Sequence, residues 1–216
     1  MSARLLAVDV CGTLYPDNTT AGFVRFHAAR TGHRPWRFRL LEALRQSPFR
    51  MAVIALGKAL RRDLFRQGYI RCLKGQPRPA LSQSAQAYAA HLEATRQIAQ
   101  THARLARMQA QGWQVMLASN SLDVVISAIA QAKSLPWVAS ALAFDGDICT
   151  GRLTTDLKGH KLRAVQAVCS FDALAVMTDN KSDTDLIRAA DLAILVAPRH
   201  PKPWMEAYPD AETLYY

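Results

Sequence analysis

Short runs of apolar residues alternate with longer amphipathic stretches along this chain of 216 residues. Four runs, at residues 5–8, 115–118, 173–177 and 192–196, have the length and composition of buried parallel strands. Stretches typical of helices lie between them. This alternation predicts an α/β fold with a doubly wound parallel sheet and helices on both of its faces.

Other segments predict additional elements around this sheet. Two apolar runs, at 138–144 and 148–153, flank the turn sequence Asp145-Gly146-Asp147, which predicts a β-hairpin. Residues 82–111 are rich in Ala and Gln and predict one long helix with a single buried face. Further helices are expected at 21–30, within 35–74 as two or three amphipathic helices, and at 121–133, 161–169 and 183–190.

The segment between the first two predicted strands is too long for a simple crossover, which needs about a dozen residues. We therefore expect residues 1–16 and 101–216 to form the α/β core, and residues 17–100 to form an inserted helical cap. Such a cap would lie over the carboxyl ends of the strands, where open α/β sheets bind ligands.

The positive charge of the chain is concentrated in that insertion. The net charge is +10, yet residues 21–80 hold fourteen lysines or arginines against two acidic residues, so this segment carries +12 and the remainder −2. Such a field attracts phosphorylated substrates, nucleic acid or an anionic membrane surface. The simpler interpretation is that these charges are solvated helix faces.

Residues 51–56 form the most apolar part of the insertion and are flanked by Arg50, Lys58, Arg61 and Arg62. An apolar helix with a cationic fringe is typical of a helix that lies on anionic lipid. The alternative is a cap helix that buries Ile54 and Leu56 against its neighbours.

Three features bear on the cellular location. The four cysteines form no CxxC pair, which is typical of reduced thiols. The N-terminus leads directly into the first strand, and no apolar run is long enough to span a bilayer. We expect a cytoplasmic protein, with peripheral attachment to the inner face of the membrane as the alternative.

The first predicted strand delivers Asp9 to its carboxyl end, where Cys11-Gly12-Thr13 follows. Gly12 permits a sharp turn, and Thr13 can bond local backbone groups. An aspartate at this edge of the sheet can be a nucleophile, a metal ligand or both. It can also be an N-cap residue without a chemical role.

The residues Asp9-x-x-Gly12-Thr13-Leu14 resemble the first motif of the haloacid dehalogenase superfamily, DxDGT(L/V). Three further motifs follow in that family's order. Ser119 ends the second strand, Lys161 precedes a helix, and the run from Asp179 to Asp183 follows the third strand. The chain is similar to the phosphoserine-phosphatase-like branch, which has a Rossmann-like core and a helical C1 cap inserted after the first motif.

The resemblance implies that Asp9 attacks a phosphoryl group and forms an aspartyl-phosphate. It also implies a bound Mg²⁺, a hard cation that prefers oxygen ligands. The Mg²⁺ ligands would be the Asp9 carboxylate, the backbone carbonyl of Cys11, and Asp179. Asp183 would be a further ligand or a carboxylate that supports them.

Ser119 and Lys161 would hold the oxygens of the transferring phosphoryl group, again by resemblance. Lys158 is the alternative to Lys161, and each of these residues has a plainer interpretation as a strand-end cap or a surface lysine. Lys161 opens a helix, where its positive charge is unfavourable next to the positive end of the helix dipole. A residue that is locally unfavourable in this way often belongs to a functional site. The other candidate substrate ligands are Thr13, Thr20 and Asn120.

Cys11 is the departure from the family motif, because it replaces the second aspartate. In the family this residue protonates the leaving group and then activates water. An unperturbed thiol has a pKa near 8.5, and nearby carboxylates raise it, so Cys11 is a poor general base at neutral pH. The consequence is slowed chemistry, replacement by water or another group, or a catalytically silent protein.

The sequence thus predicts a Mg²⁺-dependent phosphatase acting on a phosphomonoester, such as a sugar phosphate or a lipid-linked sugar phosphate. Dehalogenation is disfavoured, since all the expected metal carboxylates are present. The alternative is a catalytically weak protein whose basic cap binds a membrane or a protein. Nucleic-acid binding ranks last, because no nucleic-acid motif accompanies the basic cap.

Overall fold

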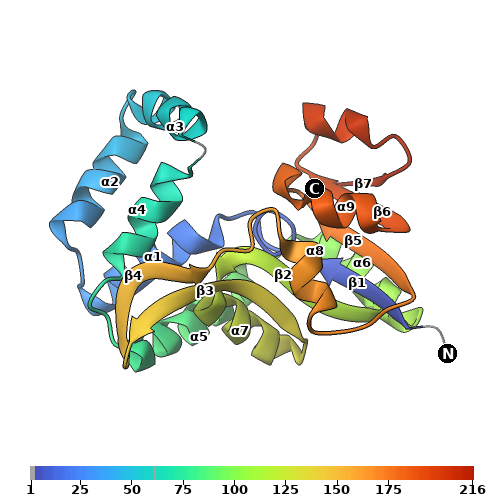
Figure 1. The fold of residues 1–216 in the computed structure, drawn as a ribbon, viewed down its shortest axis with the longest axis horizontal. Coiled ribbons are helices and arrows are strands. Elements are labelled where there is room, and N and C mark those ends of the chain that lie inside the picture. Colours follow the sequence, from blue (N-terminus) through green and yellow to red (C-terminus); the bar gives the residue numbers. More distant parts are fainter. Residues whose placement is uncertain (1–2, 61) are drawn as a thin grey trace.

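A seven-stranded sheet runs through the molecule in the order β4-β3-β2-β1-β5-β6-β7 (Figure 1). The computed structural model describes residues 3–60 and 62–216, so Met1, Ser2 and the cap residue Arg61 lie outside the described part. The strands are β1 Arg4–Val8, β2 Gln114–Leu122, β3 Trp137–Asp145, β4 Ile148–Thr155, β5 Ala173–Thr178, β6 Leu192–Ala197 and β7 Glu212–Tyr215. All neighbours are parallel except β3 and β4, which form the predicted hairpin.

The central strand β1 is buried on both sides. Leu6 and Val8 pack in one hydrophobic cluster, and Leu5 and Ala7 pack in a second cluster on the opposite face. Helices cover both faces, which confirms the doubly wound α/β fold. The first cluster includes residues of α1 (Thr19–Thr31), α5 (Arg78–Thr95), α6 (Ala99–Ala110) and α7 (Asp123–Lys133), and the second includes residues of α8 (Lys161–Gln166) and α9 (Thr184–Ala189).

Three helices, α2 (Trp36–Gln46), α3 (Arg50–Ala59) and α4 (Leu64–Cys72), form a group beside the β4 end of the sheet in Figure 1, with α2 and α3 farther from it. They confirm the helices predicted within residues 35–74, and α4 packs against β4. The helices on either side of them, α1 and α5, pack against each other and contribute to the core cluster. The division of the chain at residues 17 and 100 stays a prediction.

The single helix predicted over residues 82–111 is wrong, because two helices, α5 and α6, occupy this segment. The break has a physical cause in the loop after β1. Ile98 is buried, and its backbone N–H donates to the Leu14 carbonyl at 3.0 Å instead of continuing a helix. The edge strand β7 was not predicted, since its four residues form too short a pattern.

His27 of α1 is buried and hydrogen-bonded on both ring nitrogens. Nδ1 lies 2.9 Å from Ser84 Oγ, and Nε2 lies 2.9 Å from Gln76 Oε1. Since Gln76 Oε1 can only accept, Nε2 donates to it, and in the neutral imidazole Nδ1 accepts from the Ser84 hydroxyl. Burial lowers the pKa of His27.

We predict that this histidine makes stability depend on pH. The unfolded chain takes up a proton as the pH falls below ~6.5, before the folded protein does, so the free energy of unfolding should decrease there. Denaturant unfolding at about pH 7.5 and about pH 5.5 measures this loss. His27→Gln, which cannot titrate, should lose less stability between the two pH values. An equal loss in both proteins would contradict the assignment.

Candidate active site

The carboxyl ends of β1, β2 and β5 meet at one edge of the sheet. Val8 of β1 is in register with Leu117 of β2 and Met177 of β5. Asp9 follows directly and is held by a bond from its N–H to the Met177 carbonyl, at 2.9 Å. The chain after β5 brings Asp179 to the same edge, so two aspartates far apart in sequence lie together.

Gly12 lets these two segments approach each other. Its φ of +70° is in the left-handed region, which side chains disfavour. A Cβ built at this position would lie 2.3 Å from Asp179 Oδ2, which is closer than a carbon and an oxygen that are not bonded to each other can approach. A glycine is therefore required where the loop after β1 passes the Asp179 carboxylate.

Asp179 is fixed by two further residues. The Thr13 hydroxyl accepts a hydrogen bond from the Asp179 backbone N–H at 3.0 Å, and Thr13 is fully buried. Lys202 Nζ donates to both the carboxylate and the carbonyl of Asp179, each at 2.7 Å. Thr13 does not line the cavity described below, and its contacts orient Asp179 instead of facing a ligand.

Lys161 is a fully buried cation between two carboxylates. Its Nζ lies 2.9 Å from Asp9 Oδ1 and 2.7 Å from Asp183 Oδ2. Asp183 also accepts from the Thr178 hydroxyl at 2.7 Å. Burial opposes the charge on Lys161, but the two carboxylates outweigh it and raise the pKa of Lys161, so the lysine is protonated.

The carboxylates themselves lie in an environment that disfavours negative charge. Burial raises the pKa of Asp9 against the effect of Lys161, and the nearby charge of Asp179 raises it further. Burial also raises the pKa of Asp179, and it raises that of Asp183 to about 6. Asp9 Oδ2 is buried and has no hydrogen-bond partner among the described residues. This cluster has an excess of buried negative charge for a cation to balance.

The residues therefore fit a magnesium ion, although the described residues contain no group of three acidic, histidine or cysteine side chains close enough to hold a metal by themselves. The expected ligand set needs only two side chains, Asp9 and Asp179, together with the Cys11 carbonyl. An unpartnered buried carboxylate oxygen and two mutually repelling aspartates are the features that a divalent cation would relieve.

Cys11 stays a thiol in this site. Desolvation and the nearby negative charge of Asp9 raise the pKa of Cys11 to about 11. Its Sγ lies 2.7 Å from Thr19 Oγ1, and the Thr19 hydroxyl donates to Ser121 Oγ at 2.8 Å. Because one hydroxyl proton cannot serve both contacts, the Cys11 thiol donates to Thr19. The position occupied by an acid in the family holds a protonated, hydrogen-bonded thiol.

The remaining predicted residues divide into buried and cavity-lining groups. Ser119 is fully buried, and its Oγ accepts from the Ser121 backbone N–H at 3.2 Å. Thr20, Asn120 and Lys158 line a cavity of about 630 Å³ that also includes Asp9, Cys11 and Asp179. Ser119 and Lys161 are not among its lining residues, and Lys161 instead contacts Asp9 and Asp183. A contact of either residue with a phosphoryl group stays a prediction.

Two lining residues, Lys202 and Arg66, have no sequence motif that could have revealed them. Lys202 lies in the proline-broken tail, and only its contact with Asp179 reveals its importance. Arg66 of α4 donates to Asp156 Oδ2 at 2.7 Å, to the Asn120 carbonyl at 2.7 Å and to Ser140 Oγ at 3.0 Å. It therefore fastens α4 to the edge of the sheet beside the cavity.

Comparisons with known proteins agree with this arrangement. Residues 6–188 match the family of haloacid dehalogenase-like hydrolases. A protein of unknown function from Bordetella pertussis Tohama I is similar in structure, with a TM-score of 0.77, 16% identity and 99% of each chain covered. A phosphoserine phosphatase in its apo form has a TM-score of 0.62 and 14% identity over 98% of this chain and 92% of that chain. A cytosolic 5′-nucleotidase IIIB bound to cytidine has a TM-score of 0.62 and 15% identity, over 98% and 79% of the two chains.

No curated protein matches this chain in sequence. At the identities of the solved structures, the likeness is one of fold. It extends over nearly the whole chain, and phosphoserine phosphatases are among the proteins that share this fold. With the family match spanning most of the chain, these findings show that the protein belongs to the haloacid dehalogenase-like hydrolases.

Proposed function

We propose that this hydrolase is a Mg²⁺-dependent phosphatase that cleaves a phosphomonoester through an aspartyl-phosphate on Asp9. One observation carries the proposal. The buried Asp9 carboxylate has one oxygen fixed by Lys161 and the other without a hydrogen-bond partner among the described residues, in the wall of a cavity. A positioned carboxylate with a free oxygen is what a nucleophile requires.

Attack by Asp9 on phosphorus breaks the bond to the ester oxygen, which leaves as an alkoxide or phenolate. Water then hydrolyses the aspartyl-phosphate, releases phosphate and restores the carboxylate. Mg²⁺ held by Asp9, Asp179 and the Cys11 carbonyl would supply positive charge against the phosphoryl oxygens. Lys161 holds the Asp9 carboxylate in place, and Lys158 on the cavity wall adds positive charge for the phosphate.

This site lacks a strong acid at position 11 to protonate the leaving group. A thiol whose pKa is raised to about 11 is a poor acid and no base at neutral pH. A phenolate leaves without a proton, whereas an alkoxide does not. Cys11 therefore limits turnover of alkyl esters, unless the substrate's own groups donate the proton.

For the substrate we propose a phosphorylated small molecule. Phosphoserine phosphatase and a 5′-nucleotidase share the fold, and both names refer to phosphomonoesters. The positive cap supports an anionic substrate such as a sugar phosphate or a lipid-linked sugar phosphate.

A second candidate function is a catalytically weak protein whose cap binds an anionic membrane surface. Large apolar side chains are exposed on or next to α2 and α3: Trp36, Leu40, Phe49, Met51, Leu56 and Leu60. Arg50 and Lys58 lie among them, so apolar and cationic groups share this part of the surface. Within the described residues, every helix is too short or too polar to cross a bilayer.

Asp9→Asn should reduce phosphatase turnover by about 10⁴-fold or more, because the amide cannot form the covalent intermediate. Asp179→Asn should lower turnover and raise the Mg²⁺ concentration needed for half-maximal activity. Steady-state kinetics on an aryl phosphate over a Mg²⁺ titration measures both effects. The exposed Asp210→Asn is the matched control and should behave as wild type. Retained turnover in folded Asp9→Asn would refute the role of Asp9.

The thiol of Cys11 should be dispensable, since only its backbone carbonyl is assigned to the metal. Cys11→Ala should change turnover of an aryl ester by less than about threefold. Cys11→Asp restores a carboxylic acid and should raise turnover of an alkyl ester by about 10²-fold, the lower end of what general acid–base help supplies. A loss in Cys11→Ala as severe as that in Asp9→Asn would instead assign the thiol a direct chemical role.

If the exposed cap surface binds membranes, the protein should sediment with phosphatidylglycerol vesicles and not with phosphatidylcholine vesicles. Phe49→Ser/Met51→Ser removes two exposed apolar groups from α3 and its start and should weaken this binding. Val168→Ser, which removes an exposed apolar group outside α2 and α3, is the control. Negligible binding of the wild-type protein to both kinds of vesicle would eliminate the second candidate.

A further inference from the structure

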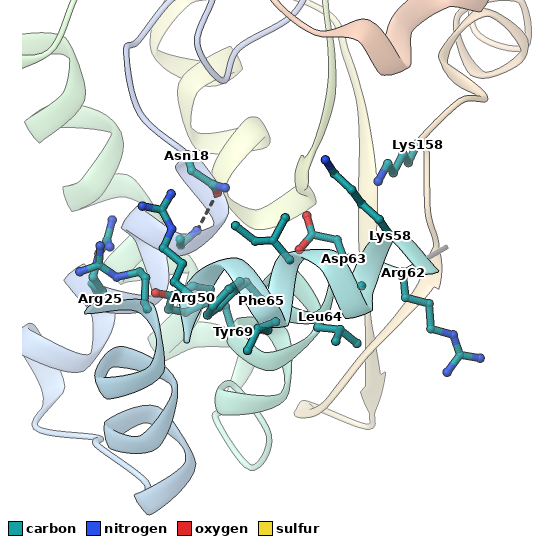
Figure 2. Close-up of a pocket in the computed structure, with 15 residues that line it drawn as sticks. Asn18, Arg25, Arg50, Lys58, Arg62, Asp63, Leu64, Phe65, Tyr69 and Lys158 are labelled. Atoms are coloured by element: carbon teal, nitrogen blue, oxygen red, sulfur yellow. Dashed lines mark hydrogen bonds between the residues drawn. The ribbon is translucent and has the colours of Figure 1, made fainter. Parts of the chain in front are cut away.

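A second cavity, of about 720 Å³, lies within the cap (Figure 2). Helices α1, α3 and α4 supply most of its wall. Its apolar residues come mainly from α3 and α4 and include Val53, Ile54, Leu64, Phe65 and Tyr69. The volume is within the range of pockets that enclose small organic ligands.

The cavity is strongly cationic. Arg25, Arg50, Lys58 and Lys158 line it, and none of them forms an ion pair with a described residue. Arg45 also lines it, but its Nη2 is paired with Glu42 Oε2 at 3.2 Å, and the lining also includes the carboxylate of Asp63. Several uncompensated cations around one cavity indicate an anionic ligand.

The charges lie at two ends of an apolar strip. In Figure 2, Arg25 and Arg50 lie on one side of the labelled residues, and Lys58 and Lys158 lie on the other. Phe65 and Tyr69 of α4 lie between the two pairs in this view. The arrangement fits a molecule with an apolar body and a negative group at each end.

This cap cavity adjoins the active-site cavity, because Asn18, Asp63 and Lys158 line both. Two of these three side chains are fixed by capping a helix. The Asn18 side chain caps α1 and that of Asp63 caps α4, by accepting from backbone N–H groups at 3.0 Å and 2.9 Å. Arg66 ties α4 to Asp156 and to the end of β2. The cavity therefore stands preformed beside Asp9.

We propose that the cap cavity binds the leaving group of the substrate. The substrate is then a phosphomonoester whose leaving group has an apolar body and a second anionic group, a phosphate or a carboxylate, at its far end. The ester phosphate lies near Asp9 and Lys158, the apolar body lies against α4, and Arg25 and Arg50 hold the second anion. This inference rests on the proposed phosphatase function for the identity of the first group.

Binding can be measured without turnover. Calorimetry in the presence of Mg²⁺ compares octane bisphosphonate, which has a phosphonate at each end, with octyl phosphonate, which has one. The wild-type protein should bind the bisphosphonate about tenfold more tightly, as expected for charge-assisted bonds to the second anion. Inorganic pyrophosphate, with two anionic groups and no apolar body, should bind more weakly than the bisphosphonate.

Arg25→Gln/Arg50→Gln should abolish the preference for the bisphosphonate, and Arg50→Lys should keep most of it. Arg34→Gln/Arg39→Gln removes the same charge from exposed positions that do not line the cavity, and should leave the preference intact. Thermal melting establishes that each variant is folded. The proposal is overturned by a wild-type protein without the preference, by a preference that survives the first double substitution, or by an equal loss in the control.

Turnover of octyl phosphate and of octanediol bisphosphate separates this inference from the function on which it rests. Hydrolysis of both esters with equal kcat/KM would support the phosphatase and refute the second-anion site. Failure to hydrolyse these alkyl esters and an aryl phosphate as well, with the binding preference and its loss in Arg25→Gln/Arg50→Gln intact, would support the site and refute the phosphatase. A lower KM for the bisphosphate with unchanged kcat is the result we expect.

Discussion

The buried ammonium group of Lys161 is the interaction on which the site depends. Without it, Asp9 and Asp183 would be two carboxylates in a desolvated interior at the end of β1 and β5. Removing one partner of such a buried pair typically costs about 3–5 kcal/mol. The same contact holds Asp9 Oδ1 and leaves Oδ2 without a partner among the described residues. One interaction thus maintains the local structure and orients the group we assign as nucleophile.

Much of this arrangement could be predicted from the sequence, because local patterns determine it. Apolar runs free of turn residues predicted the parallel strands, and an Asp-Gly turn predicted the β3–β4 hairpin. The carboxyl ends of neighbouring parallel strands must meet, so Asp9 and Asp179 were expected at one edge. Lys161 stood out because it begins a helix, where its charge is unfavourable unless a partner is near.

What the sequence did not reveal depends on contacts between distant segments. The break between α5 and α6 exists because Ile98 bonds to the loop after β1, and no local signal marks it. Lys202 reaches Asp179 from the C-terminal tail. In the sequence, nothing distinguishes Arg66 from the other arginines near it, and only its bonds to Asp156, Asn120 and Ser140 show its role. The cap cavity is likewise a product of packing, since its cations come from four separate parts of the chain.

The central claim is that Asp9 carries the phosphoryl group during turnover. Hydrolysis of that intermediate should be slow, because the Cys11 thiol is a poor base, and the intermediate should accumulate. Mass spectrometry of acid-quenched protein during turnover of an aryl phosphate tests this directly. The account predicts a phosphoryl group on the peptide that contains Asp9, and none in Asp9→Asn. Turnover with the phosphoryl group on another residue, or with no covalent adduct at any time, would contradict it.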